Sequence, residues 1–151
     1  MKTYHRILVP ISAGSHSDIL LQRAAELAHA QHTKMLVVHV LDTRSGFESD
    51  GPAAVLPGEA AARRAPKVRK RLDLQLARNN LSWVEAKVVW GEPKAVLADV
   101  IRAWAPDLVV THSGHQLPQG IAEGMDIFTV GRRSLLRRLA EVLYIPTLRH
   151  A

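Results

Sequence analysis

Strand-like and helix-like segments alternate along this chain of 151 residues, and that alternation restricts the fold more than any other feature. Short apolar runs rich in β-branched residues predict buried strands at 7–11, 35–41, 83–90, 108–110 and 144–148. Between them, apolar residues recur at helical spacing. The order β-α-β-α-β-α-β-α-β is typical of an α/β fold with a mostly parallel, five-stranded sheet covered by helices on both faces. Right-handed crossovers favour a doubly wound, Rossmann-like arrangement.

Start and stop signals support the predicted helices. Ser15, Ser17 and Asp18 can cap the first helix. The second covers roughly 59–79, and Pro66 predicts that it begins near that residue or kinks there. Pro93 suits the first position of the third helix. Apolar residues predict the last helix at 135–143, and segments 42–58 and 111–129, rich in loop-forming residues, are predicted to be long loops.

Composition indicates one globular domain over residues 1–151. Hydrophobic residues make up 47% of the chain and charged residues 23%, which is ordinary for a folded protein. There is no cysteine, so disulfides and thiolate metal sites are excluded. No apolar run approaches the roughly 18 residues of a membrane span, and no signal-like region precedes Ile7. We therefore expect a cytoplasmic protein that does not enter a membrane.

The chain is basic, with a formal net charge of +6. Its cations gather in two clusters, which interleave with apolar residues at helical spacing: Arg63, Arg64, Lys67, Arg69, Lys70 and Arg71, and then Arg132, Arg133, Arg137 and Arg138. This pattern favours the solvated faces of two amphipathic helices. Binding of an anionic ligand is an alternative, and a nucleic-acid surface is the less favoured one.

A ligand site is expected where a doubly wound sheet binds its ligands, beyond the carboxyl ends of the strands at the point where strand order reverses. The segments after the first and fourth strands meet there. Pro10 and Ser12 follow the first, and Thr111 and Gly114 follow the fourth. Glycine allows a ligand to approach the backbone, and Arg133 can bind phosphate through two hydrogen bonds.

Metal and catalytic motifs are weak by comparison. His29 and His32 are three residues apart, as are His112 and His115, but no third ligand completes either pair at a recognisable spacing. His112 precedes Ser113 without the Gly-x-Ser-x-Gly turn of a nucleophile elbow. We therefore predict neither a metal site nor a catalytic residue.

Four segments resemble the universal stress protein family, in family order and over nearly the whole chain: HRILVPISAGSHSDILLQRAAELA, MLVVHVLD, VVWGEPKAVLADVIRAWAPDLVVTHSGH and RSLLRRLAEVLYIPTLRH. The first resembles the family's opening strand and Ser-rich helix start. The third resembles its Gly-x-Pro turn, third helix and following strand. The resemblance implies the universal stress protein type of the doubly wound fold and a possible adenine-nucleotide site.

The same resemblance implies a degraded form of that site. Nucleotide-binding members have an aspartate where this chain has Ser12, and a phosphate loop that reads Gly-x-x-Gly, nine residues, then Gly-Ser or Gly-Thr. Thr111 and Arg133 replace two of its glycines. The implied contacts are Pro10, Ser12, Val40, Thr111, Gly114, Gly131, Arg133 and Ser134. The resemblance favours the family branch in which ATP binding is weak or lost. Retained binding, with Arg133 at the phosphates and Gly131 replacing a lost glycine, is the alternative.

The resemblance further implies a homodimer formed through the last strand, over Ile145, Pro146, Thr147 and Leu148. A short apolar strand at a sheet edge is physically suited to such pairing. We therefore predict a non-enzymatic stress-response protein that acts through dimerisation or partner binding. The alternative is an ATP-binding switch with slow or no hydrolysis.

Overall fold

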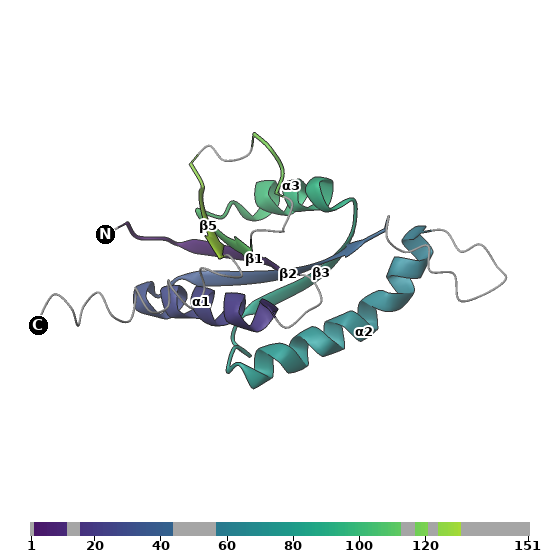
Figure 1. Cartoon of the computed structure of the whole chain (residues 1–151), viewed down its shortest axis with the longest axis horizontal. Helices are drawn as coiled ribbons and strands as arrows, with labels where there is room; N and C mark the ends of the chain where they lie inside the picture. The colour runs from purple at the N-terminus through teal and green to yellow at the C-terminus, as the bar shows by residue number, and fades with distance from the viewer. Residues whose placement is uncertain (1, 12–15, 44–56, 113–116, 121–123, 131–151) are drawn as a thin grey trace, which may run out of the picture.

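The computed structural model describes residues 2–11, 16–43, 57–112, 117–120 and 124–130. They form five strands and three helices in the order β1 (Arg6–Ile11), α1 (His16–Gln31), β2 (Lys34–Asp42), α2 (Pro57–Arg78), β3 (Glu85–Gly91), α3 (Pro93–Trp104), β4 (Leu108–His112) and β5 (Asp126–Val130). The strands make one parallel sheet in the order β3-β2-β1-β4-β5 (Figure 1). The predicted doubly wound α/β class is confirmed.

The fifth strand is not where the sequence analysis expected it. Asp126–Val130 pairs in parallel with β4, from Leu108 opposite Asp126 to His112 opposite Val130. The prediction of one loop over 111–129 was therefore wrong. The run Ile127-Phe128-Thr129-Val130 has strong strand propensity. It is short and stands between Gly124 and Gly131, so the sequence around it predicts a loop. The strand predicted at 144–148 and the helix predicted at 135–143 lie outside the described residues.

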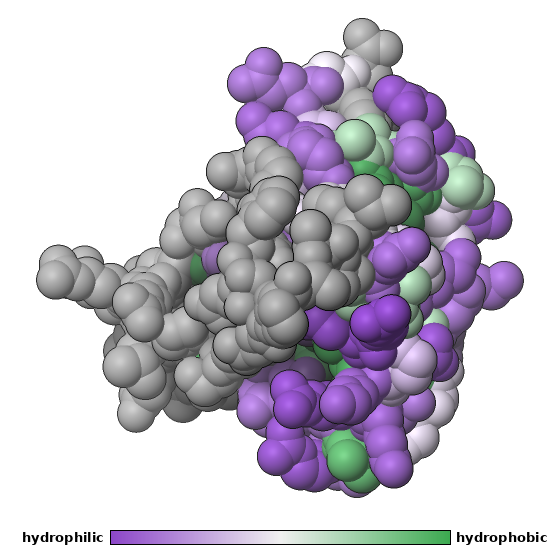
Figure 2. Space-filling view, turned by 90° about the vertical axis from the view of Figure 1, so that its right-hand side faces the viewer, coloured by the Kyte–Doolittle hydropathy of each residue, from purple (hydrophilic) through white to green (hydrophobic). Residues whose placement is uncertain are grey.

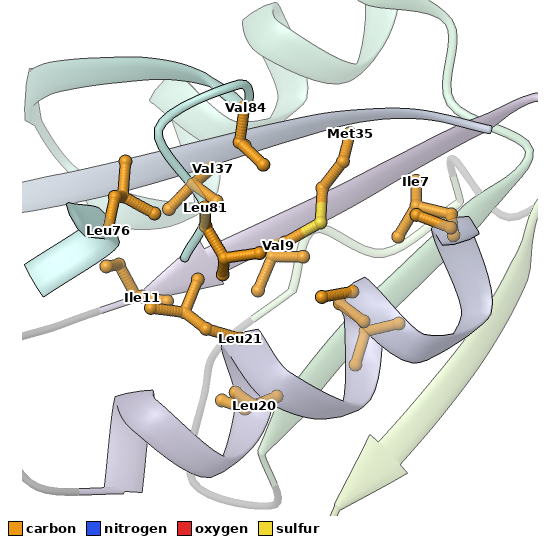
Figure 3. Packing of buried hydrophobic residues seen from close by; sticks show 14 of the residues in the cluster. Ile7, Val9, Ile11, Leu20, Leu21, Met35, Val37, Leu76, Leu81 and Val84 are labelled. Atoms are coloured by element: carbon orange, nitrogen blue, oxygen red, sulfur yellow. The ribbon is translucent and has the colours of Figure 1, made fainter. Parts of the chain in front are cut away.

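The helices divide between the two faces of the sheet. Residues of α1 and α2, such as Leu21 and Leu76, pack with Ile7, Val9 and Val37 in one cluster (Figure 3). The alternate residues of the same strands, among them Leu8 and Val38, pack with Leu97 and Ile101 of α3. Leu117 and Met125, from the β4–β5 connection, also contact this second cluster. The connection therefore crosses on the face of α3, as the usual right-handed crossover requires.

Local signals account for the ends of α3. The Glu92 carboxylate accepts a hydrogen bond of 2.8 Å from the backbone N–H of Ala95, and Pro93 occupies the first turn. Ala105 ends the helix in the left-handed conformation with φ 52°. By contrast, α2 does not begin at Pro66: it starts at Pro57 and contains Pro66 in its interior. Strand β3 lies at the sheet edge, and Trp90 is 44% exposed there.

Candidate functional site

The candidate site lies at the carboxyl edge of the sheet, where the strand order reverses between β1 and β4. From β1 the chain moves outward through β2 to β3, and it then returns past β1 to β4 and β5. Buried residues close the ends of the inner strands: Pro10 and Ile11 in β1, Val40 in β2 and Thr111 in β4. Since all strands are parallel, these ends share one edge of the sheet.

Strands β1 and β4 share a shorter ladder than the other neighbours in the sheet. It pairs Ile7 with Leu108 and Leu8 with Val109 and then stops, although both strands continue. Pro10 has no N–H with which to extend a ladder, and this accounts for an early end. Two adjacent strands that continue without pairing leave backbone groups near their carboxyl ends available to a ligand or to the segments that follow.

Thr111 occupies the end of β4 with only 2% of its surface exposed. It follows Val109 by two residues and therefore faces the same side of the sheet as α3. Its hydroxyl lies 3.5 Å from the carbonyl oxygen of His112, at the limit of a hydrogen bond. A buried, β-branched side chain therefore fills the space at the end of β4.

His39 is a further feature of this edge of the sheet. It lies in β2 between Ile11 of β1 and Val88 of β3, half-buried on the face of α1 and α2. Burial lowers the pKa of the His39 imidazole, and the nearby cation Arg64 of α2 lowers that pKa further. At neutral pH the edge therefore carries a neutral imidazole. The sequence signal was a histidine inside an otherwise apolar strand.

The structure places only part of the predicted site. Pro10, Val40 and Thr111 come to one edge of the sheet, at the ends of three adjacent strands. The other predicted contacts lie outside the described residues: Ser12, Gly114, Gly131, Arg133 and Ser134. The strand predicted to form the dimer, Ile145 to Leu148, lies outside them as well.

The histidine pairs that suggested metal ligands fall in different surroundings. The ring of His29 packs against that of Trp83, with centroids 5.0 Å apart. His32 directly follows the end of α1 and has a left-handed backbone conformation. His115 lies outside the described residues. Within the described ranges, no three side chains of histidine, aspartate or glutamate are grouped as metal ligands would be. In the same part of the chain, none of the helices combines the length and the apolar character of a membrane span.

The strand order and the position of this edge define a doubly wound α/β protein, the class that binds ligands where the strand order reverses. Residues 3–124 match the model of the universal stress protein family, and the chain belongs to that family. The match ends just before β5. None of the curated proteins matches the chain.

Solved structures of universal stress proteins share this fold. A universal stress protein from Burkholderia pseudomallei is 21% identical, with a TM-score of 0.58 over 84% of this chain and 96% of that one. A universal stress protein in complex with cAMP is 14% identical, with a TM-score of 0.55 over 85% and 96%. A family member from Archaeoglobus fulgidus in complex with dAMP is 15% identical, with a TM-score of 0.53 over 85% and 98%.

Proposed function

We propose that this universal stress protein acts by binding rather than by catalysis, and that its carboxyl edge holds adenine nucleotides weakly or not at all. The observation that carries the proposal is the burial of Thr111 at the end of β4. A glycine at this position lets phosphate oxygens approach the backbone, whereas a buried threonine side chain fills the space beside the backbone that those oxygens need. Ser12, in place of the family's aspartate, removes a charged acceptor for the nucleoside.

Calorimetric titration with Mg-ATP, AMP and cAMP tests the proposal directly. We expect no saturable heat below about 1 mM ligand, which corresponds to a binding free energy weaker than roughly −4 kcal/mol. A Kd below about 0.1 mM for any of the three nucleotides would overturn it.

A gain-of-function variant tests the physical reason. Thr111→Gly combined with Ser12→Asp restores two family residues, and we expect it to bind AMP at least about tenfold more tightly than the parent, a gain of about 1.4 kcal/mol. Thr129→Gly is the matched control, because Thr129 lies opposite Thr111 on β5. It makes the same exchange on the neighbouring strand, and we expect no change in nucleotide affinity.

The second candidate function is a nucleotide switch at the same edge. It is supported by the family structures that contain cAMP, dAMP and AMP. In this chain such a nucleotide would lie against Pro10, Val40 and Thr111, with Arg133 available to the phosphates. Equilibrium dialysis with labelled ATP, followed by phosphate release, separates the two functions. Tight binding with slow or no hydrolysis would favour the switch.

Partner binding includes self-association in this proposal. The family resemblance supports a homodimer formed through residues Ile145 to Leu148. Sedimentation velocity at micromolar concentration tests it, and we expect a dimer that Ile145→Asp converts to a monomer. Ile127→Asp is the control, because Ile127 is 45% exposed on β5, away from that segment in sequence. A monomer throughout this concentration range would contradict the dimer.

A further inference from the structure

Helix α2 presents a row of cations on the side that points away from the sheet. We call this surface the basic stripe. It consists of six exposed residues on the outer side of the helix: Arg63, Lys67, Lys70, Arg71, Leu74 and Arg78. Figure 1 shows α2 lying along the outside of the molecule, and Figure 2 views the right-hand side of Figure 1, where hydrophilic residues predominate among the coloured atoms.

The spacing of these residues places them on one side of the helix. Arg63, Lys67, Lys70 and Leu74 follow one another at intervals of four, three and four residues, which keeps them on one helical face. Leu72 and Leu76 lie on the opposite side, where they are 2% and 3% exposed against the sheet. From Arg63 to Arg78 the stripe is about 22 Å long, at 1.5 Å per residue.

The charge of the stripe is not balanced within the described part of the chain. The ion pair of α2 joins Arg69 to Asp73 at 3.1 Å, and both of these residues lie on its flank. Arg69 also donates a hydrogen bond of 2.7 Å to the carbonyl oxygen of Ala86 in β3. None of the five cations of the stripe has a described carboxylate within 4.0 Å. Among the described residues, the cations of the stripe therefore form a positive surface without ion-paired carboxylates.

Leu74 distinguishes this stripe from a simple solvated face. It is 61% exposed, the highest value among the large apolar side chains of the described residues. Lys70, Arg71 and Arg78 precede or follow it by four, three and four residues, so cations surround it on the helix surface. An apolar side chain ringed by charged residues is the pattern of a small protein–protein contact, with an apolar centre and a polar rim.

Nucleic acids and lipid surfaces fit the stripe less well than a protein does. A phosphate backbone has no apolar pocket for Leu74, and the stripe contains no aromatic residue on which a base could stack. An interfacial helix inserts its apolar side into the lipid, but that side of α2 packs on the sheet through Leu72 and Leu76. The observations therefore favour an acidic protein surface.

We propose that the basic stripe is a docking site for an acidic protein segment, whose carboxylates pair with the cations while an apolar pocket receives Leu74. This inference rests on the proposed function, because it names the chemistry of the partner that a non-enzymatic binding protein requires. It involves a surface on α2 and not the carboxyl edge, so each can fail without the other. Charge complementarity speeds association, and the apolar contact contributes to residence time.

A labelled acidic peptide provides the probe. We choose a helical peptide of roughly 16 residues with glutamates on one face around a pair of small apolar residues, matched in length to the stripe. Fluorescence anisotropy measures its affinity for the full chain between 50 and 300 mM salt. We expect saturable binding that weakens steeply with salt, because exposed charge pairs are screened.

Two triple variants separate the stripe from net charge. Lys67→Gln/Lys70→Gln/Arg71→Gln removes three charges from the stripe. Lys87→Gln/Lys94→Gln/Arg102→Gln removes three exposed charges from β3 and α3. We expect the first to weaken peptide binding about tenfold or more and the second less than about twofold. Equal losses would overturn the proposal, since net charge alone would then explain the binding.

Leu74→Gln separates a protein partner from a nucleic acid. We expect it to weaken peptide binding about threefold to tenfold without changing the salt dependence, because it removes apolar contact and no charge. A 20-base-pair DNA duplex and phosphatidylserine vesicles are tested under the same conditions. Tighter binding of either one, together with no effect of Leu74→Gln, would overturn the proposal in favour of that partner. Circular dichroism confirms that each variant is folded.

Discussion

The Tyr4 hydroxyl donates a hydrogen bond of 2.7 Å to the carboxylate of Asp126, 122 residues further along the chain. Tyr4 precedes β1, and Asp126 is the first residue of β5. The ammonium group of Lys2 lies 2.7 Å from the same carboxylate oxygen. These contacts connect the beginning of the chain to the edge strand that the sequence analysis missed. They also make the position of β5 testable in solution.

The first prediction uses the titration of Tyr4. Its hydrogen bond to the Asp126 carboxylate, together with partial burial and the negative charge of Asp126, raises the pKa of Tyr4 above the usual value near 10. Ultraviolet difference titration can follow it alone in a Tyr144→Phe background, because the chain has two tyrosines. We expect Asp126→Asn to lower the pKa of Tyr4. Asp99→Asn, on α3, is the control and should leave it unchanged.

The same experiment tests the register of β5. If Asp126→Asn leaves the titration of Tyr4 where it was, the contact does not form in solution. The placement of β5 beside β4 would then lose its side-chain support.

The elements that the sequence predicted share a clear local signal. The ends of α3 follow from Glu92 and Pro93 at its start and from Pro106 just after its end, and the burial of β1 and β2 follows from continuous apolar runs. By contrast, β5 depends on pairing with β4 across the sheet, and a run of four strand-forming residues does not reveal such a partner. The formation of β5 therefore depends on tertiary pairing and not on a local sequence signal.

The location of the candidate site was predictable from the sequence, but the properties of some of its residues were not. The rule that ligands bind where strand order reverses located the carboxyl edge, and Pro10, Val40 and Thr111 do lie there. The ionisation of His39 was not predictable, because it depends first on the burial of the imidazole and then on Arg64, a residue of another element that approaches only in the folded chain. The basic face of α2 was expected from helical spacing, and its six cations of 63–71 are all exposed. The exposure of Leu74 among these cations required the structure.

The second prediction concerns acid stability and His39. Burial, and then Arg64, lower the pKa of this histidine in the folded state, so the unfolded chain takes up a proton at a higher pH than the folded chain. The contribution of His39 to the free energy of unfolding is therefore fully present above about pH 6.5, and it is lost as the pH falls from there toward the folded pKa. Urea denaturation at several pH values should show the free energy of unfolding decreasing below that pH. We expect His39→Gln to reduce the decrease, and His5→Gln, at an exposed site, to leave it in place.

Arg64→Gln provides an independent check of the cause. Removing this cation should raise the pKa of His39 partway toward its ordinary value and weaken the pH dependence, although the imidazole remains buried. An unchanged pH profile in Arg64→Gln would assign the whole effect to burial.

The third prediction tests the orientation of α2 on which the basic stripe depends. Leu72 is 2% exposed and Leu74 is 61% exposed, although they are two residues apart on the same helix. We expect Leu72→Ala to lower the free energy of unfolding by about 2–5 kcal/mol, through lost burial and a cavity. Leu74→Ala should change it by less than about 0.5 kcal/mol. Chemical denaturation measures both, and similar losses would show that the helix is rotated from the orientation described.

The last prediction concerns the turn between β3 and α3. Gly91 has a φ of 147°, and a Cβ atom added there would lie 2.6 Å from Cγ1 of Val96. Gly91→Ala therefore meets both an unfavourable backbone conformation and a close contact, and we expect a loss of stability of about 2–4 kcal/mol. Gly120→Ala is the control: its φ is 77°, but nothing lies within 4 Å of the added atom, so only the backbone cost of about 1 kcal/mol remains. Val96→Ala in the Gly91→Ala background should recover part of the loss, because it removes the atom that the new methyl group meets. A double-mutant cycle with no coupling between positions 91 and 96 would show that backbone conformation alone selects glycine at this turn.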